Sequence, residues 1–186
     1  MPEHTISGPL TLALIGAGRA GRSLAAHAVA AGHRVVLEDV LPSRLREAFA
    51  EIPTEKMPGS LETVTTVEDA VRNADLAIDF VPDELESKLE IVCMVDRMAP
   101  PKTIFCINTR TLSVDDLARC TYRADRCVGA SVGHDIHIVT GSLTSPESAA
   151  TVERFFLSCG FAVTSGREQV PAGYDVPANP VPVTTR

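Results

Sequence analysis

The sequence predicts an α/β fold in which helices cover both faces of a doubly wound, mainly parallel sheet. Three observations predict it. An apolar run over residues 10–15 leads directly into the glycine-rich sequence GAGRAG, and a helical pattern and a second apolar run follow. Strand-like and helix-like segments then alternate nearly to the end of the chain. The 186 residues, 45% hydrophobic and 4% aromatic, suffice for one aliphatic core, so we expect a single Rossmann-type domain.

The glycine-rich turn has the spacing G-x-G-x-x-G, which is typical of dinucleotide binding when it joins a strand to a helix. Gly16 permits the tight turn, Gly18 lets the backbone approach a pyrophosphate, and Gly21 lets the helix pack on the strand. Arg19 and Ala20 complete the start of that helix, where free N–H groups and the positive dipole end favour phosphate. We therefore predict that these five residues bind a dinucleotide; the alternative is a structural turn without a ligand.

An acid after the second apolar run indicates which dinucleotide binds. Asp39 follows the glycine turn by roughly twenty residues, where a carboxylate accepts hydrogen bonds from the adenosine ribose hydroxyls. A 2′-phosphate there would meet two carboxylates, because Glu38 precedes Asp39. Arg44 could offset that charge, but we interpret it as a solvated helix residue. The sequence therefore predicts NAD(H) rather than NADP(H).

The other elements follow from apolar periodicity and from capping and breaking residues. Further strands are predicted at residues 34–37, 76–81, 103–107, 127–132, 136–139 and 161–164. Helices are predicted at residues 42–49, 66–74, 84–98, from 113 onward, and 145–158. Thr66, Ser113 and Ser145 are the expected N-cap residues of three of these helices. Residues 51–62 contain two prolines and a glycine, and we expect them to form a polar connector.

The chain is expected to have three parts. Residues 1–9 form an N-terminal extension, residues 10–166 the NAD-binding domain, and residues 167–186 a mobile or docking tail. Four prolines between Pro171 and Pro182 oppose an ordered helix in that tail.

Composition excludes several classes of partner. The net charge of −7 argues against a nucleic-acid or anionic-membrane surface. No apolar stretch reaches the length of a membrane span, and the first residues lack the features of a signal peptide. The five cysteines show no C-x-x-C spacing, so we expect free thiols in a reducing cytoplasm and no metal site.

Four segments resemble 3-hydroxyacyl-CoA dehydrogenases. Residues 74–88, ADLAIDFVPDELESK, are similar to the family's ADLVIEAVPEDLELK, and residues 99–114, APPKTIFCINTRTLSV, to APPDAILASNTSSLSI. Residues 126–129, RCVG, resemble RVIG, and residues 141–150 resemble GEQTSPETVA. The similarity covers roughly residues 10–165 and implies the NAD-binding domain of that family.

The resemblance also implies the nicotinamide end of the NAD site. It places Asp83, where the family has Glu, and Lys88 at the nicotinamide–ribose side, with Val81 and Pro82 leading into this segment. Residues bordering the nicotinamide would be Asn108, Thr109 and Thr111. The alternatives are a solvated helix residue for Lys88 and a strand-end turn for Asn108.

The family's catalytic set is not retained. Its mechanism uses a His base oriented by a Glu, with a Ser and an Asn nearby. Ungapped alignment from Asn108 puts Arg110 at the Ser, Ser131 at the His and His134 at the Asn, and the Glu position falls near His137. Arginine cannot act as a base near neutral pH, and a serine without a partner base is a poor proton acceptor. His134 can titrate near pH 7 and remains the candidate base; the alternative is an exposed loop histidine.

Three functional hypotheses follow. The first is an NAD(H)-binding protein without the usual dehydrogenase activity. The second is a small oxidoreductase that acts on a hydroxy or oxo acid or an acyl-CoA, with His134 exchanging the proton and Arg110 clamping a carboxylate. The third is one half of a split dehydrogenase, because the family's helical substrate domain would begin where these residues end.

We also expect a homodimer or a partner protein. In the family, the helical domain covers the flank of the NAD-binding domain. Without it, an apolar patch would be exposed beside the last helix, which soluble monomers rarely tolerate. The patch would contain Val152, Phe155, Phe156 and Phe161. The alternative is that the C-terminal tail covers it.

Overall fold

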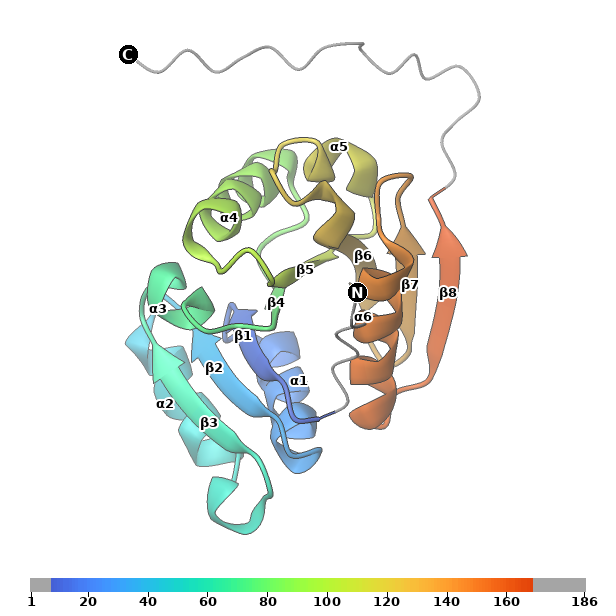
Figure 1. Ribbon diagram of the computed structural model, residues 1–186. Helices are drawn as coiled ribbons and strands as arrows, with labels where there is room; N and C mark the ends of the chain where they lie inside the picture. The colour runs from blue at the N-terminus through green and yellow to red at the C-terminus, as the bar shows by residue number, and fades with distance from the viewer. Residues whose placement is uncertain (1–7, 169–186) are drawn as a thin grey trace, which may run out of the picture.

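A computed structural model describes residues 8–168, which form one eight-stranded sheet with helices on both faces (Figure 1). The strand order is β3-β2-β1-β4-β5-β6-β7-β8. The strands are β1 (Thr11–Ile15), β2 (Arg34–Glu38), β3 (Ser60–Val64), β4 (Leu76–Asp79), β5 (Ile104–Asn108), β6 (Cys127–Val132), β7 (Ile136–Thr140) and β8 (Val163–Arg167). The α-helices are α1 (Arg19–Ala30), α2 (Pro42–Glu51), α3 (Val67–Val71), α4 (Leu85–Met98), α5 (Val114–Ala118) and α6 (Pro146–Ser158), with short 3-10 turns η1 (Thr54–Lys56) and η2 (Ala124–Arg126).

The sheet confirms the predicted fold class. The six strands β1 to β6 all run parallel to one another. Strand β7 is antiparallel to β6, and β8 is parallel to β7. The chain winds outward from β1 to β3 and then returns to place β4 on the other side of β1. This reversal of strand order lies at the carboxyl ends of β1 and β4, which is where doubly wound folds bind ligands.

Two hydrophobic cores lie on the two faces of the sheet. Side chains alternate along each strand, so Leu12 and Leu14 of β1 enter one core while Ala13 and Ile15 enter the other. Helices α1, α2 and α6 pack on the first core, through residues such as Leu24, Leu45 and Phe155. Helices α3, α4 and α5 pack on the second, through residues such as Val71, Val92 and Leu117.

The three predicted N-caps are confirmed. The hydroxyls of Thr66, Ser113 and Ser145 accept hydrogen bonds from the backbone N–H three residues later, at the starts of α3, α5 and α6. Each cap satisfies a helix N–H group that would otherwise lack a partner. The sequence therefore predicted where these helices begin.

The predicted polar connector was too long, because residues 60–64 form the edge strand β3. Gly59 permits this entry into the sheet: a Cβ at this position would lie 2.3 Å from the carbonyl oxygen of His33. The N–H of Ser60 donates to that same oxygen, and β3 then pairs parallel with β2. A short, half-exposed strand directly after a proline and a glycine resembles a loop in its sequence.

The end of the sheet also differs from the prediction. Strand β8 covers Val163–Arg167 rather than residues 161–164, because Phe161 turns onto the first core. The N–H of Glu168 then donates to the carbonyl oxygen of Thr140. The described structure therefore continues two residues into the predicted tail, and residues 1–7 and 169–186 lie outside it.

The predicted apolar patch on α6 is wrong. Val152, Phe155 and Phe156 are at most 2% exposed, and Phe161 packs against the same core. The Phe155 and Phe156 rings lie 5.0 Å apart, and the ring of His27 on α1 stacks on Phe161 at 4.8 Å. These side chains fill the space between α6, α1 and the sheet, so they give no reason to expect a homodimer or a partner protein.

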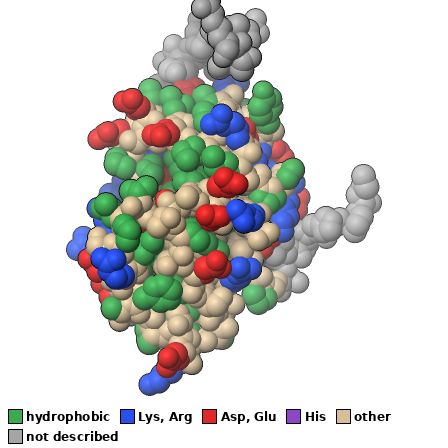
Figure 2. Space-filling view, turned by 90° about the vertical axis from the view of Figure 1, so that its left-hand side faces the viewer, with side chains coloured by type: hydrophobic (Ala, Val, Ile, Leu, Met, Phe, Trp, Pro, Cys, Tyr) green, Lys and Arg blue, Asp and Glu red, His purple; other side chains and the backbone are tan. Residues whose placement is uncertain are grey.

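The surface over α2, β3 and α3 carries mixed charge. Figure 2 shows this side, with Asp and Glu side chains interspersed among Lys and Arg and with scattered hydrophobic groups. No helix in residues 8–168 is long and apolar enough to cross a membrane.

A buried histidine makes the stability of the fold depend on pH. The Nδ1 atom of His33 accepts a hydrogen bond from the N–H of Leu10 at 3.0 Å, and Nε2 lies 2.9 Å from the hydroxyl of Ser158. Because Nδ1 accepts, the ring is neutral in the folded state, and burial lowers the pKa of His33 from its ordinary 6.5. As pH falls, His33 takes up a proton more readily in the unfolded chain than in the folded one. The contribution of neutral His33 to the free energy of unfolding is therefore lost as pH falls.

We expect the change in the free energy of unfolding between pH 7.5 and 5.5 to be less favourable in the wild type than in His33→Gln, which removes the titrating group. Urea unfolding at both pH values, with the exposed His137→Gln as control, measures the difference. Burial and Asp39 raise the pKa of Glu38 to about 7, so Glu38 acts in the opposite direction, and comparing variants at equal pH cancels its effect. Equal pH slopes in the wild type and His33→Gln would contradict this assignment.

Candidate functional site

The glycine-rich loop follows the carboxyl end of β1, and its glycines are needed for two different reasons. Gly16 has φ +104°, and a Cβ on Gly21 would lie 2.0 Å from the Gly16 carbonyl oxygen, so the fold itself requires both glycines. A Cβ on Gly18 would meet nothing within 4 Å. Nothing in the described protein therefore demands glycine at position 18, as expected where a ligand approaches the backbone.

Helix α1 begins beside this open space. Gly18 is its N-cap residue and has no side chain to bond the first N–H groups of the helix. In the part of the chain that the structure describes, the N–H groups of Arg19, Ala20 and Gly21 have no capping partner, so they can bind an anion, aided by the positive end of the helix dipole. The predicted pyrophosphate residues thus lie together at one helix start.

Asp39 fixes the shape of the glycine loop. It is 3% exposed, and its Oδ2 accepts hydrogen bonds from the N–H of Ala17 at 2.9 Å and from Nη1 of Arg44 at 3.2 Å. Its Oδ1 accepts from the N–H of Leu41 at 2.9 Å. The predicted ribose acceptor therefore also ties β2 to the loop after β1, and Arg44 is its ion-pair partner rather than a purely solvated residue.

Glu38 beside it is only partly charged. Burial, and then the negative charge of Asp39, raise the pKa of Glu38 to about 7, so its carboxyl is partly protonated at neutral pH. The sequence-based expectation of two full charges here was too simple.

A fully buried ion pair underlies the middle of the site. Lys88 on α4 and Asp79 at the end of β4 are both inaccessible to solvent, and the Lys88 ammonium binds Oδ1 of Asp79. The ammonium also donates to the carbonyl oxygen of Asn108 at 2.5 Å, while the Asn108 N–H donates to Oδ2 of Asp79 at 3.0 Å. Lys88 thus lies beneath the predicted nicotinamide side, and it is not a solvated helix residue.

Two effects act in opposite directions on the pKa of Asp79. Burial raises the pKa of Asp79, while the charge and hydrogen bond of Lys88 lower it. Asn108 extends the network, because its Oδ1 accepts a hydrogen bond from the N–H of Val132 at 3.1 Å. One connected set of polar groups therefore joins β4, α4, β5 and β6 at their site-facing ends.

Asp83 organises the loops after β4 and β5. Its carboxylate accepts hydrogen bonds from Oγ1 of Thr109 at 2.6 Å, the N–H of Arg110 at 2.9 Å and Oγ1 of Thr111 at 3.1 Å. Burial opposes its ionisation, but these donors and the positive charge of Lys88 hold the pKa of Asp83 below its usual range. The structure thus brings together the segment with Val81, Pro82 and Asp83 and the segment after β5.

The predicted catalytic residues are only partly assembled. Arg110 and Ser131 meet, with Nε of Arg110 donating to the Ser131 hydroxyl oxygen at 3.0 Å. His134 lies in the turn between β6 and β7, its side chain is 99% exposed, and Nδ1 lies 3.1 Å from Oδ1 of Asp135. It forms no hydrogen bond with Arg110 or Ser131 within the described structure, so it fits the exposed loop histidine of the alternative interpretation. His137, which the ungapped alignment puts near the Glu position, forms a hydrogen bond between its Nδ1 and Oγ1 of Thr164.

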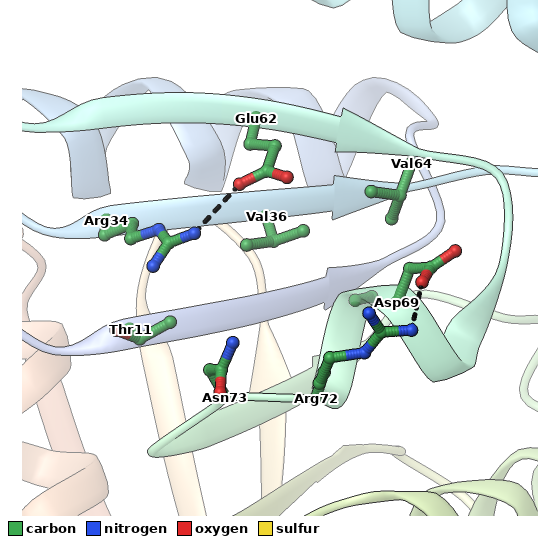
Figure 3. A pocket seen from close by; sticks show the side chains of 9 residues that line it. Thr11, Arg34, Val36, Glu62, Val64, Asp69, Arg72 and Asn73 are labelled. Atoms are coloured by element: carbon green, nitrogen blue, oxygen red, sulfur yellow. Dashed lines mark hydrogen bonds and ion pairs between the residues drawn. The ribbon is translucent and has the colours of Figure 1, made fainter.

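A hollow of about 170 Å³ lies elsewhere, over the face of β1, β2 and β3 that α3 borders (Figure 3). Two ion pairs line it, Arg34–Glu62 at 3.0 Å and Arg72–Asp69 at 2.7 Å. None of the predicted site residues contributes to its wall. The carboxyl ends of β1, β4 and β5, where the predicted site residues gather, are therefore the candidate site.

Sequence reasoning missed two supporting acids. Asp79 could have been found, because it is an acid at the end of an otherwise apolar strand. Glu168 had no local signal: its carboxylate accepts the N–H groups of Val114 and Asp115 at 2.9 and 3.0 Å, capping α5 from a distant part of the chain.

A family description, "3-hydroxyacyl-CoA dehydrogenase, NAD binding domain", matches residues 11–165. The chain belongs to this family. It therefore carries an NAD-binding domain, as the glycine loop and Asp39 predicted, and the resemblance noted in the sequence is confirmed.

Similar proteins are longer than this chain. An L-carnitine dehydrogenase from Pseudomonas putida is 31% identical over 87% of this chain and 56% of its own length. The mitochondrial hydroxyacyl-coenzyme A dehydrogenase of Sus scrofa is 33% identical over 62% of this chain and 44% of its own. The crystal structure of a 3-hydroxyacyl-CoA dehydrogenase from Archaeoglobus fulgidus superposes with a TM-score of 0.74, at 31% identity, over 87% of this chain and 58% of that one. The chain thus spans about half the length of these relatives.

The buried pair predicts a large asymmetry between single and double substitutions. We expect Asp79→Asn to destabilise the fold by about 3–5 kcal/mol, because it leaves a buried ammonium without its counter-charge. Asp79→Leu combined with Lys88→Met removes both charges and recovers much of that loss. Urea unfolding followed by circular dichroism measures all three proteins.

The matched control is Glu62→Gln, which breaks the Arg34–Glu62 pair, whose side chains are 51% and 55% exposed. Such a surface pair contributes about 0–1 kcal/mol. If Asp79→Asn costs no more than Glu62→Gln, the buried pair does not have the importance assigned to it.

Proposed function

We propose that this chain binds NAD(H) through the family's dinucleotide site but does not catalyse the family's usual 3-hydroxyacyl-CoA dehydrogenation. One observation carries the proposal. The dinucleotide side is fully ordered by Asp39, Asp83 and the buried Asp79–Lys88 pair, whereas the expected catalytic side pairs an arginine with a serine.

In this proposal the cofactor lies along the carboxyl ends of β1, β4 and β5. Its pyrophosphate faces the start of α1 and its adenosine ribose faces Asp39. Its nicotinamide end faces the loops after β4 and β5, which contain Val81, Pro82, Asp83, Asn108 and Thr109. Lys88 supports that end from below by holding the Asn108 carbonyl rather than by touching the cofactor.

The absence of a placed base supports the second half of the proposal. The Ser131 hydroxyl oxygen already accepts a hydrogen bond from a cationic guanidinium, which makes it a still weaker proton acceptor. Arg110 stays protonated at neutral pH. His134 is exposed to solvent and bonded to Asp135, so no histidine is held against the proposed nicotinamide position by the described residues.

We expect NADH to bind, NADPH to bind much more weakly, and Gly18→Val to abolish NADH binding. A side chain at position 18 blocks the backbone approach to the pyrophosphate, and Asp39 opposes a 2′-phosphate. Because a Cβ at Gly18 meets nothing, the variant keeps its fold at a cost of about 1 kcal/mol for the altered helix start. Titration calorimetry measures binding, and thermal unfolding checks the fold.

Gly8→Val is the matched control, since a Cβ at Gly8 also meets nothing within 4 Å but lies outside the loop. Equal affinity for NADH and NADPH would refute the assignment of Asp39. Unchanged NADH binding by folded Gly18→Val would refute the position of the pyrophosphate.

We expect acetoacetyl-CoA reduction by NADH to be absent or very slow. Loss of a general base alone typically costs about 10²–10⁴-fold, and dehydrogenases of ordinary efficiency turn over at about 1–10³ s⁻¹. Loss of NADH absorbance at 340 nm follows the reaction, and His134→Gln tests the candidate base that remains. Turnover in the ordinary range would overturn the proposal, and its loss in His134→Gln would identify His134 as the base.

A further inference from the structure

Arg110 places an uncompensated positive charge at the candidate site. It lies two residues after the end of β5, and it forms no ion pair with any carboxylate in residues 8–168. Lys88, the cation nearest in the same network, is neutralised by Asp79, and Arg44 is paired with Asp39. Arg110 therefore has charge available for a ligand.

Both ends of this residue are held. Its backbone N–H donates to Oδ2 of Asp83 at 2.9 Å, and its Nε donates to the Ser131 hydroxyl at 3.0 Å. A guanidinium has five N–H donors, and among residues 8–168 only the Nε donor of Arg110 is used, which leaves the two terminal nitrogens as a planar fork without a partner in that part of the chain. A side chain held at both ends loses less conformational freedom when it binds a ligand.

The neighbouring acid does not compete for this fork. Asp83 accepts hydrogen bonds from Thr109, Thr111 and the Arg110 backbone, and these donors hold its pKa low. Gly133 lies beside the fork, since a Cβ built on it would come within 3.5 Å of Nη2 of Arg110. The absence of a side chain at this position keeps that flank of the guanidinium unhindered by Gly133 itself.

We propose that Arg110, oriented by Ser131, binds the carboxylate of a small hydroxy or oxo acid beside the nicotinamide end of the NAD(H) site. The inference rests on the proposed NAD(H) function, since the cofactor supplies the other wall of this subsite. A carboxylate matches the fork, because two oxygens in a plane meet two parallel N–H donors.

Charge favours a monoanion over a larger polyanion. One guanidinium balances one carboxylate, whereas an acyl-CoA brings several phosphate charges toward a chain of net charge −7. The competing explanation is that Arg110 only links the end of β5 to β6 through Ser131. A purely structural link does not distinguish an acid from its ester, and this difference provides the test.

The experiment measures ligand binding to the NADH complex of the full chain. At saturating NADH, 3-oxobutanoate and pyruvate are titrated by calorimetry, with ethyl 3-oxobutanoate as the neutral match and inorganic phosphate as a second anion. We expect at least one acid to bind, and the ester and phosphate to bind more weakly. Arg110→Gln should weaken acid binding by about tenfold or more, because a charge-assisted hydrogen bond is lost. Arg110→Lys should give an intermediate value, since it keeps the charge without the fork.

Arg34→Gln is the matched control, because Arg34 is a half-exposed arginine at the amino end of β2. It should leave acid binding unchanged, and all variants should keep the wild-type affinity for NADH. Failure of the wild type to bind NADH would contradict the proposed function itself. With NADH bound, the inference is overturned if neither acid binds, if ester or phosphate binds as well as the acid, or if Arg110→Gln binds the acid like the wild type.

Discussion

The carboxyl edge of the sheet depends on the buried contact between Asp79 and Lys88. Two charges in a dry interior are costly unless each is paired and hydrogen-bonded, and here both conditions hold. The Lys88 ammonium bonds the Asn108 carbonyl and Asp79 bonds the Asn108 N–H, so β4, α4 and β5 meet at one residue. The side-chain oxygen of Asn108 in turn accepts a hydrogen bond from the N–H of Val132 on β6. The loops after β4 and β5 therefore begin from strand ends that this hydrogen-bond network holds together.

Similar tertiary ties position the loops themselves. Asp39 bonds Ala17 in the loop after β1, and Asp83 bonds Thr109 and the Arg110 N–H after β5. In both cases a carboxylate, buried in Asp39 and exposed in Asp83, satisfies donors on a neighbouring loop, which reduces the ordering that a ligand would have to induce. The carboxyl edge of the sheet is thus pre-arranged by three aspartates, one just after β2 and two at and after the end of β4, whereas the turn with His134 extends into solvent.

Local chemistry explains which features could be predicted from sequence. The glycine spacing, the acid after β2, the helix caps and the β–α alternation are encoded within a few residues, and the structure bears out the caps and the alternation. Strand β3 was missed because its pairing with β2 comes from the distant close approach of Gly59 to His33. The burial of Phe155, the partner of Lys88 and the cap from Glu168 were missed for the same reason, since each depends on residues brought together only by folding.

The departures from the family's catalytic set are physically linked. If position 131 held the histidine that the resemblance implies, the Arg110 guanidinium would face an imidazole that becomes cationic on accepting a proton, and like charges at this distance repel. Serine instead offers Nε an oxygen acceptor without a charge. Arginine at 110 and serine at 131 therefore suit each other and do not suit a histidine base, so the two residues differ from the resembled pattern as a pair.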